Sequence, residues 1–386
     1  MADVMTSTDP PSTDFLIVGA GMAGASAAYF LAPHGSVTVL EAEAMPGYHT
    51  TGRSAAFFAE SYGGPRIQPL TTGSKDFFFT PPAGFSDLPL VGGRGALYIA
   101  RQSQLNTLER LLETLQPVVP ALRRIDGAQA VASVPVLRAD HVAAAVQDPD
   151  CRDLDVAAIH QGFLRGMKAA GGRLVTDARL TGLDRHAGRW TVDTTQGRFA
   201  AETIVNCGGA WGDEVARLAG ARPLGLTPLR RTIILFPWRD GQVPDHWPLV
   251  LDIDEAFYFK PETGRILASP ADETPMPACD VQPDEMDVAI TVDRLERATH
   301  LTAGRIESKW AGLRTFSPDR VPVVGFDPDV AGFFWCVGQG GYGIQTAPAM
   351  GRLTAALATG AAVPADLAAL GVRPRSYSPA RFLASA

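Results

Sequence analysis

Residues Asp14–Leu40 read DFLIVGAGMAGASAAYFLAPHGSVTVL, and this stretch decides the fold. A short apolar run typical of a buried strand, Asp14–Val18, leads directly into Gly19-Ala-Gly-Met-Ala-Gly24. Small, helix-compatible residues follow, and Ser36–Leu40 is a second β-branched run that ends at Glu41. A strand, a glycine-rich turn, a helix, a second strand and an acid in this order predict a dinucleotide-binding α/β unit.

Each of the three glycines in this turn has a physical reason. Gly19 permits the tight turn, Gly21 lets the backbone approach a pyrophosphate, and Gly24 lets the helix pack closely on the strand. The helix N-terminus offers N–H groups to phosphates, and Glu41 can accept hydrogen bonds from ribose hydroxyls. The alternative is a glycine-rich turn in an ordinary α/β sheet. The predicted contacts are Gly19, Ala20, Gly21, Met22, Ala23, Gly24, Glu41 and Ala42.

Composition excludes several classes of protein. The chain has 386 residues, enough for two domains, and is 46% hydrophobic and 19% charged, so a packed core is expected. A formal net charge of −7 disfavours a nucleic-acid partner. The four cysteines have no C-x-x-C spacing, which argues against a metal site and a disulfide scaffold and favours a reducing compartment.

The apolar stretch Phe15–Ala32 does not have the pattern of a membrane span. It contains three glycines, Pro33 follows it, and no Lys or Arg occurs before Arg53. We therefore expect no transmembrane segment, a disordered tail over residues 1–13, and a cytoplasmic protein, with peripheral attachment at the inner membrane as an option.

Four further segments favour FAD over NAD as the dinucleotide. Pro46–Ala56, PGYHTTGRSAA, is a loop suited to run along an extended cofactor, and Thr203–Trp211 is a strand that ends in a glycine pair. Gly332–Thr346 is a second glycine-rich strand–loop–helix, and the strand pair after Gly172 fits a piece under the adenine. The added contacts are Thr51, Gly52, Arg53, Ser54, Ala55, Ala56, Leu180, Cys207, Gly208, Gly209, Gly340, Tyr342, Gly343, Ile344 and Gln345.

These stretches, together with DEAFYFKP at 254–261 and WAGLRTFSPD at 310–319, resemble the D-amino-acid oxidase superfamily. Within it the chain is most similar to bacterial FAD-dependent D-arginine and D-amino-acid dehydrogenases. The resemblance implies an α/β fold: a Rossmann-like FAD-binding domain of the GR2 type, interleaved with a substrate domain on a mostly antiparallel β-sheet. The FAD domain would comprise 14–75, 145–220 and 306–386, and the substrate domain 76–144 and 221–305.

Two arginines are candidates to bind a substrate carboxylate. Arg314 lies between aromatic residues, and Arg231 starts a strand pattern. A guanidinium offers a carboxylate two parallel hydrogen bonds. Arg230 and Arg231 could instead be an exposed pair on an edge strand. Tyr258 should face opposite to Phe257 and Phe259, and it could simply pack in the core.

The resemblance assigns roles to these positions. It implies that Arg314 and Arg231 hold the carboxylate, that Tyr258 and Tyr62 assist, and that the Gly341 carbonyl receives the substrate nitrogen. Tyr62 would lie on a mobile loop, and Gln345 would lie at the flavin end.

Two departures from the D-arginine enzymes point to another substrate. No Asp or Glu occurs between Asp87 and Glu109, where those enzymes carry an acid; Ala96 is the nearest match, and Phe57 replaces a histidine. A buried cationic side chain without a partner is costly, so a neutral or apolar side chain is expected. Gly312 occupies the position of a FAD-linking cysteine, so FAD should be noncovalent, with Cys207 and Cys336 packed as small hydrophobes.

The expected reaction is oxidative deamination of D-amino acids to 2-oxo acids and ammonia, by hydride transfer to flavin N5. The electron acceptor would be oxygen, a quinone or another compound. An amine oxidase like the sarcosine and glycine oxidases, which produce hydrogen peroxide, is the main alternative. A 2-hydroxy-acid dehydrogenase and a non-catalytic flavin-binding subunit are two others.

Overall fold

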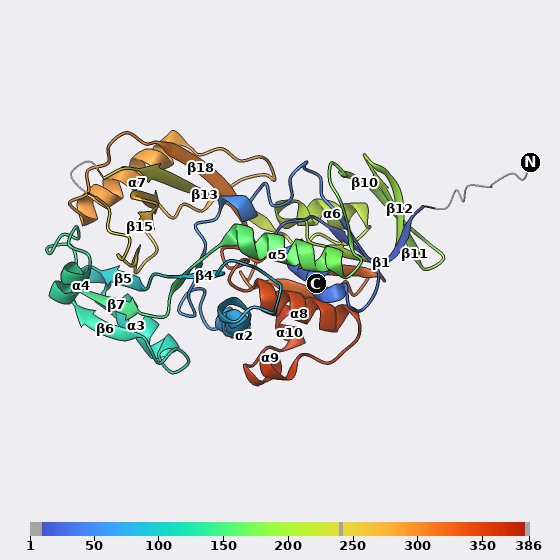
Figure 1. Ribbon diagram of the computed structural model, residues 1–386, viewed down its shortest axis with the longest axis horizontal. Helices are drawn as coiled ribbons and strands as arrows, with labels where there is room; N and C mark the ends of the chain where they lie inside the picture. The colour runs from blue at the N-terminus through green and yellow to red at the C-terminus, as the bar shows by residue number, and fades with distance from the viewer. Residues whose placement is uncertain (1–9, 239–241, 383–386) are drawn as a thin grey trace, which may run out of the picture.

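The computed structural model describes residues 10–238 and 242–382, which form two lobes side by side (Figure 1). An eight-stranded sheet forms the basis of one lobe, in the order β10-β11-β12-β1-β2-β9, with β20 beside β12 and β19 beside β20. Its strands are β1 (Ser12–Val18), β2 (Val37–Leu40), β9 (Arg173–Val175), β10 (Leu180–His186), β11 (Arg189–Thr194), β12 (Gly197–Asn206), β19 (Val323–Phe326) and β20 (Phe333–Val337). The strands β9, β2, β1, β12 and β20 run parallel.

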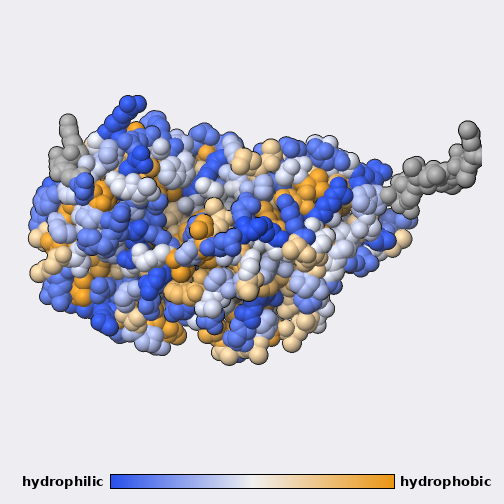
Figure 2. All heavy atoms as spheres, viewed as in Figure 1, coloured by the Kyte–Doolittle hydropathy of each residue, from blue (hydrophilic) through white to orange (hydrophobic). Residues whose placement is uncertain are grey.

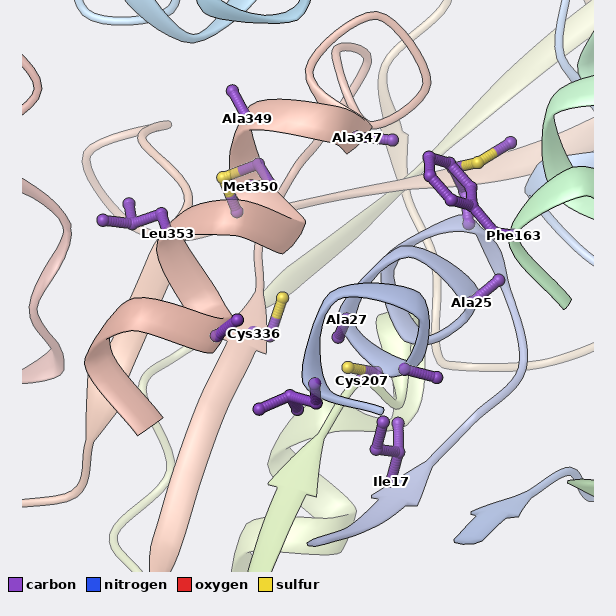
Figure 3. Packing of buried hydrophobic residues seen from close by; sticks show 14 of the residues in the cluster. Ile17, Ala25, Ala27, Phe163, Cys207, Cys336, Ala347, Ala349, Met350 and Leu353 are labelled. Atoms are coloured by element: carbon purple, nitrogen blue, oxygen red, sulfur yellow. The ribbon is translucent and has the colours of Figure 1, made fainter. Parts of the chain in front are cut away.

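Helices cover one face of this sheet closely. Helix α1 (Met22–Leu31) packs against α5 (Val156–Ala169) and α8 (Ala347–Ala358) around a buried apolar cluster that Figure 3 shows. The close approach of α1 and α8 needs small residues, because a Cβ on Gly351 would lie 2.2 Å from the Ser26 hydroxyl oxygen. That hydroxyl also donates to the Ala347 carbonyl at 2.6 Å. The remaining helices of this lobe are α2 (Gln68–Phe79), α6 (Gly212–Leu218), α9 (Ala365–Ala369) and α10 (Pro374–Tyr377).

A nine-stranded sheet forms the second lobe, in the order β17-β13-β16-β15-β14-β5-β7-β6, with β18 on the other edge of β13. All its pairs are antiparallel except β14 with β5. The strands are β5 (Ala96–Ala100), β6 (Arg123–Asp126), β7 (Ala144–Asp148), β13 (Thr227–Phe236), β14 (Leu249–Asp252), β15 (Tyr258–Glu262), β16 (Arg265–Ser269), β17 (Thr274–Pro275) and β18 (Ser308–Phe316). Helices α3 (Leu105–Leu115), α4 (Gly127–Ser133) and α7 (Glu285–Ala298) accompany them.

Short elements join the lobes. A three-stranded sheet contains β3 (Phe57–Phe58), β8 (Arg152–Leu154) and β4 (Val91–Gly93). Single 3₁₀ turns occur at Thr51–Arg53, Gln102–Gln104, Gly209–Trp211 and Pro379–Phe382. The face in Figure 2 is mostly hydrophilic, with apolar residues interspersed, which is ordinary for a folded protein. Within the described ranges, none of the helices is long and apolar enough to cross a membrane.

The predicted fold class is confirmed: a parallel α/β sheet accompanies a mostly antiparallel one. The predicted alternation at Tyr258 is also confirmed, since Tyr258 packs in one apolar cluster while Phe257 and Phe259 pack in another. The two glycine-rich strand–loop–helix units are present as β1–α1 and β20–α8.

Two boundaries differ from the expectation. The predicted disordered tail is wrong at its end, because Ser12 and Thr13 belong to β1 and pair with Ala200 and Ala201 of β12; residues 1–9 lie outside the described residues. Strands β7 and β18 fall in segments assigned to the FAD domain, yet both belong to the nine-stranded sheet. The division into two domains otherwise stays a prediction.

Candidate active site

A long cleft follows the carboxyl ends of the parallel strands and continues along β13 and β18 of the second sheet. Gly19, Glu41 and Cys207, which directly follow β1, β2 and β12, line it from one side. Arg231 and Arg314 line it from the other. The cleft holds about 1680 Å³, including space that opens to solvent. Ligands of open α/β sheets bind at this edge.

The glycines of the first turn differ in what surrounds them. Gly19 has a φ of +98°, and a Cβ there would lie 2.7 Å from the Cys207 carbonyl oxygen. A Cβ on Gly24 would lie 1.9 Å from the Gly19 carbonyl oxygen. A Cβ on Gly21 would meet only the Thr51 hydroxyl, at 3.4 Å, and Gly21 lines the cleft. Gly19 and Gly24 therefore fix the turn, while Gly21 keeps the cleft open.

Hydrogen bonds hold the turn in this shape. The Glu41 carboxylate accepts from the Ala20 amide at 2.8 Å and from the Glu43 amide at 3.0 Å. The Met22 amide, at the start of α1, donates to the Thr51 hydroxyl at 2.9 Å. The N-terminus of a helix attracts anions through its backbone amides and its dipole, so this end of the cleft suits a pyrophosphate.

His160 supports the same turn from behind. Its Nε2 lies 2.8 Å from the Ala20 carbonyl oxygen, and the side chain is buried. Burial lowers the pKa of His160, against the opposing effects of the Ala20 carbonyl and Glu41. The neutral ring donates to the carbonyl. Sequence reading missed His160, because nothing near it in the chain marks it as a neighbour of Ala20.

The loop Pro46–Ala56 lies along the cleft and is tied to the second lobe. The Thr50 hydroxyl donates to the Leu313 carbonyl at 2.7 Å. Arg53 donates to the Ala311 carbonyl at 3.2 Å and pairs with Asp280 at 2.5 Å. The loop therefore has a defined path between the two sheets.

Most of the predicted cofactor contacts line this one cleft. They are Gly19, Gly21, Met22, Ala23, Glu41, Ala42, Thr51, Arg53, Ser54, Ala55, Leu180, Cys207, Gly208, Gly209, Gly340, Gly343 and Ile344. The lining does not include Ala20, Gly24, Gly52, Ala56, Tyr342 or Gln345. The Gln345 amide instead bonds Ala59, Tyr62 and Thr71, so it positions the segment that carries Tyr62.

Arg314 is the centre of the predicted carboxylate site. Its guanidinium donates to the Tyr62 hydroxyl at 3.1 Å. Among the described residues no carboxylate pairs with it, although other arginines of the cleft have acidic partners. Burial lowers the pKa of Arg314, but Tyr62 and Tyr258 outweigh burial, and the net pKa is raised above the usual arginine value. The charge is permanent, and among the described residues the Tyr62 hydroxyl is the one hydrogen-bond acceptor for this guanidinium.

Gly341 lets this guanidinium pack closely against the backbone. A Cβ on Gly341 would lie 2.9 Å from Arg314 Nη1 and 3.3 Å from the Tyr62 hydroxyl oxygen. Any side chain there would displace the guanidinium or the Tyr62 hydroxyl. The Gly341 backbone and the Arg314 guanidinium thus lie against each other, and both line the cleft.

The two tyrosines differ in their hydrogen bonds. Tyr62 is buried, accepts from Arg314, and packs edge-on against Tyr342 with ring centroids 5.1 Å apart. Tyr258 is 4% exposed, and its hydroxyl has no hydrogen-bond partner among the described residues. A buried hydroxyl without a partner is unfavourable, so Tyr258 offers an unused donor close to Arg314.

Arg231 is already paired. It donates to the Asp272 carbonyl at 2.9 Å, and its Nη2 lies 3.4 Å from the Glu273 carboxylate. Arg230 points to the opposite face and pairs with Asp287 at 2.8 Å. The side chains of Arg230 and Arg231 are 11% and 6% exposed, so the alternative of an exposed edge-strand pair is wrong.

The chain is similar to known FAD-dependent oxidoreductases. A family profile described as DAO, FAD-dependent oxidoreductase, matches residues 14–357. The uncharacterized oxidoreductase YurR of Bacillus subtilis (strain 168) is 26% identical over 408 residues, 96% of this chain and 99% of that protein. Glycine oxidase of Pseudomonas putida is 28% identical over 190 residues, 47% of this chain and 49% of that protein.

Solved structures share the fold. A crystal structure of L-proline dehydrogenase from P. horikoshii aligns with a TM-score of 0.82 and 22% identity, over 97% of this chain and 99% of that chain. The glycine-lined turn, the open cleft and the helix N-terminus at its end fit FAD. On the family match and this cleft, the chain belongs to the DAO family of FAD-dependent oxidoreductases, and FAD is its cofactor.

Proposed function

We propose that the protein oxidises the Cα–N bond of a small amino acid, and that D-amino acids with neutral or apolar side chains are its substrates. The products would be the 2-oxo acid and ammonia, after water hydrolyses the imine. The electrons would pass from the flavin to oxygen, a quinone or another acceptor. The similarity to bacterial D-arginine and D-amino-acid dehydrogenases, like the stereochemistry, stays a prediction.

One observation carries the proposal: the Arg314 guanidinium faces the cleft without an acidic partner among the described residues. A charged group in such a place is costly unless a ligand completes it. A carboxylate in the cleft can accept from Arg314, and the Tyr258 hydroxyl, which is buried without a partner among the described residues, would become a second donor if it turned toward the cleft. Arg231 would contribute if the carboxylate displaced Glu273 from its weak contact.

The chain's own residues would orient the substrate. Fixing the carboxylate at Arg314 leaves the amine near the Gly341 backbone, where the carbonyl can accept its N–H. FAD, when bound, supplies the two-electron acceptor that receives the Cα hydrogen as hydride. The substrate ammonium must first lose a proton to solvent, and we assign no side chain as its base.

The preference for a neutral side chain rests on the apolar cluster that contains Tyr62 and Tyr258. Phe57 and Ala96 are buried in the same apolar cluster as Tyr62 and Tyr258. Two buried acids in this region are already engaged: Asp148 accepts from the Ser61 hydroxyl at 2.5 Å, and Glu60 pairs with Lys75 at 2.7 Å. Glu255 is exposed on a nearby turn and raises the pKa of Arg314, which makes it the residue to test if a basic substrate is preferred.

The test is anaerobic reduction of the bound flavin by a panel of D-, L- and N-methyl amino acids, read from the loss of flavin absorbance. We expect D-leucine, D-methionine or D-phenylalanine to reduce the flavin faster than D-arginine, and Arg314→Ala to abolish saturation. Faster reduction by D-arginine that Glu255→Gln removes would overturn the side-chain preference. No reduction by any amino acid would overturn the function.

A sarcosine- or glycine-oxidase-like amine oxidase is the second candidate. Glycine oxidase of Pseudomonas putida and mouse mitochondrial sarcosine dehydrogenase are among the similar proteins, the latter 21% identical over 369 residues, 39% of its own length. The same carboxylate site would hold glycine or sarcosine. Peroxide formation with sarcosine in air, together with slow reduction by D-leucine, would favour this candidate.

A further inference from the structure

Two cysteines stand opposite each other beside the cleft. Strands β12 and β20 pair in parallel, with Val205 opposite Phe334 and Asn206 opposite Trp335. The next pair in this register is Cys207 and Cys336. Neighbouring strands lie about 4.8 Å apart, which is within the Cα separation of about 4.4–6.8 Å that a disulfide spans.

The two thiols interact with each other and with few other groups. Cys207 and Cys336 pack in the same apolar cluster, and each affects the pKa of the other. The Thr354 hydroxyl and the Gln339 amide donate to the Cys336 sulfur at 3.5 and 3.6 Å. Figure 3 shows both side chains in the cluster between helices α1 and α8.

This surrounding makes the two sulfurs chemically unequal. The neighbouring Cys207 thiol, and the hydrogen bonds from Thr354 and Gln339, lower the pKa of Cys336. The neighbouring Cys336 and burial raise the pKa of Cys207. The thiolate is the reactive form of cysteine, so Cys336 is the sulfur more easily ionised.

Access to the pair comes from the cleft. Cys207 lines the cleft, while Cys336 lies behind it and is 1% exposed. Cys151 is buried elsewhere, and Cys279 is only partly buried. The pair therefore combines a neighbouring thiol with a path for a small oxidant, whereas Cys151 is buried and Cys279 is accessible without a partner thiol among the described residues.

We propose that Cys207 and Cys336 form a redox modification site that hydrogen peroxide converts to a disulfide between β12 and β20. Peroxide oxidises one sulfur to the sulfenic acid and leaves as one water. The second sulfur then attacks the first, the S–O bond breaks, and a second water departs. In sum, two thiols and one peroxide give one disulfide and two waters.

The site is coupled to the cofactor through its position. The Cys207 carbonyl oxygen is the atom that a Cβ on Gly19 would strike, so Cys207 is part of the floor under the dinucleotide turn. A cofactor in the cleft would cover Cys207. Oxidation should therefore be severalfold slower in the FAD-loaded protein than in the same chain stripped of FAD.

Peptide mapping tests the proposal directly. The full-length protein, with FAD and stripped of FAD, is exposed to hydrogen peroxide, the remaining thiols are alkylated, and the protein is digested with trypsin without reductant. We expect the peptides spanning 199–217 and 321–352 to be joined, at a mass lower by two hydrogen atoms, and to separate with dithiothreitol.

Three variants complete the design. Cys279→Ala should form the link as the unaltered chain does. Cys207→Ala and Cys336→Ala should form none, and the remaining thiol should go on to the sulfinic acid. A link that involves Cys279 or Cys151, over-oxidation of both sulfurs without a link, or no reaction in a folded FAD-free chain would overturn the proposal. None of these readouts depends on the substrate.

Discussion

Arg231 and Arg314 lie on the same face of two neighbouring antiparallel strands, because Arg231 stands opposite Gly312 and Arg314 stands opposite Leu229. Residues in this diagonal relation are close enough for long side chains to converge. Of the two, only Arg231 has a carboxylate within ion-pair distance among the described residues, Glu273 at 3.4 Å. The two guanidinium groups can thus converge on one ligand, and Arg314 is the one without an ion-pair partner among the described residues.

Replacing Arg314 should therefore damage catalysis more than folding. Truncating one member of a buried charge pair costs about 2–5 kcal/mol, so Arg314→Ala should lower kcat/KM by about 30-fold to several thousandfold. Arg314→Lys should recover part of this, since it keeps the charge but loses the fork. Steady-state kinetics measures both. The surface change Arg297→Lys is the control, and an Arg314→Ala enzyme with normal kcat/KM would contradict the assignment.

Tyr258 offers a test in which stability and activity move in opposite directions. Tyr258→Phe removes a buried hydroxyl that has no described partner, so it should raise the free energy of unfolding by about 1 kcal/mol. It should also lower kcat/KM, because the hydroxyl is then missing for the substrate. Tyr62→Phe is the matched contrast: it breaks the bond from Arg314 and should lower stability. Urea denaturation measures stability, and steady-state kinetics measures activity. If Tyr258→Phe lowered the free energy of unfolding, the hydroxyl would have a structural role and the prediction would be contradicted.

Gly341 should tolerate no side chain. In Gly341→Ala the new methyl group would lie 2.9 Å from Arg314 Nη1. We expect KM to rise by about tenfold, the result of roughly 1–3 kcal/mol of crowding, while bound FAD remains at its normal level. Gly92→Ala, where a Cβ would lie 3.8 Å from its nearest neighbour, is the control. An unchanged KM would remove Gly341 from the substrate site.

Two glycines of the first turn should respond differently to alanine. Gly21→Ala points into the cleft, so the folded chain should keep its melting temperature without FAD but hold less FAD. Gly24→Ala would strike the Gly19 carbonyl oxygen and should lower the stability of the FAD-free chain by about 1–3 kcal/mol or more. Flavin absorbance after gel filtration and thermal denaturation separate the two effects. Equal losses in both variants would mean that Gly21 is also a packing residue.

His160 makes stability depend on pH. Its pKa is lowered in the folded state by burial, so the unfolded chain binds a proton at higher pH than the folded chain does. The stability that neutral His160 provides is complete above about pH 6.5 and is lost as the pH falls below it. We expect the free energy of unfolding to fall between pH 7 and pH 5, and His160→Gln to flatten this slope. The exposed His34→Gln should leave the slope unchanged; an unaltered slope in His160→Gln would contradict the prediction.

Local patterns predicted the framework of this protein well. The turn from Gly19 to Gly24 is encoded within a few residues, because backbone conformation and close packing there admit only glycine. The face that Tyr258 presents follows from strand alternation alone. The resemblance brought Arg231, Arg314 and Gly341 to one cleft, where the structure also has them.

Contacts between distant segments could not be read in this way. Tyr62 and Arg314 are separated by 252 positions in the chain, and the partner of Arg231 comes from a loop 42 positions away. No periodicity relates such segments, since their meeting depends on how two sheets pack. For the same reason, the sequence did not indicate that His160 contacts Ala20. It also did not indicate that Gln345 positions the segment of Tyr62 and does not line the cleft.

The bonds that Glu41 and Thr51 make to Ala20 and Met22 come from the chain itself, so the shape of the nucleotide-binding turn does not depend on contacts with the flavin. Binding of the flavin would then cost little backbone conformational entropy. The flavin would be held tightly because the turn is rigid as well as because of the contacts it makes. Association of the flavin should therefore need little conformational change, and its dissociation should be the slow step.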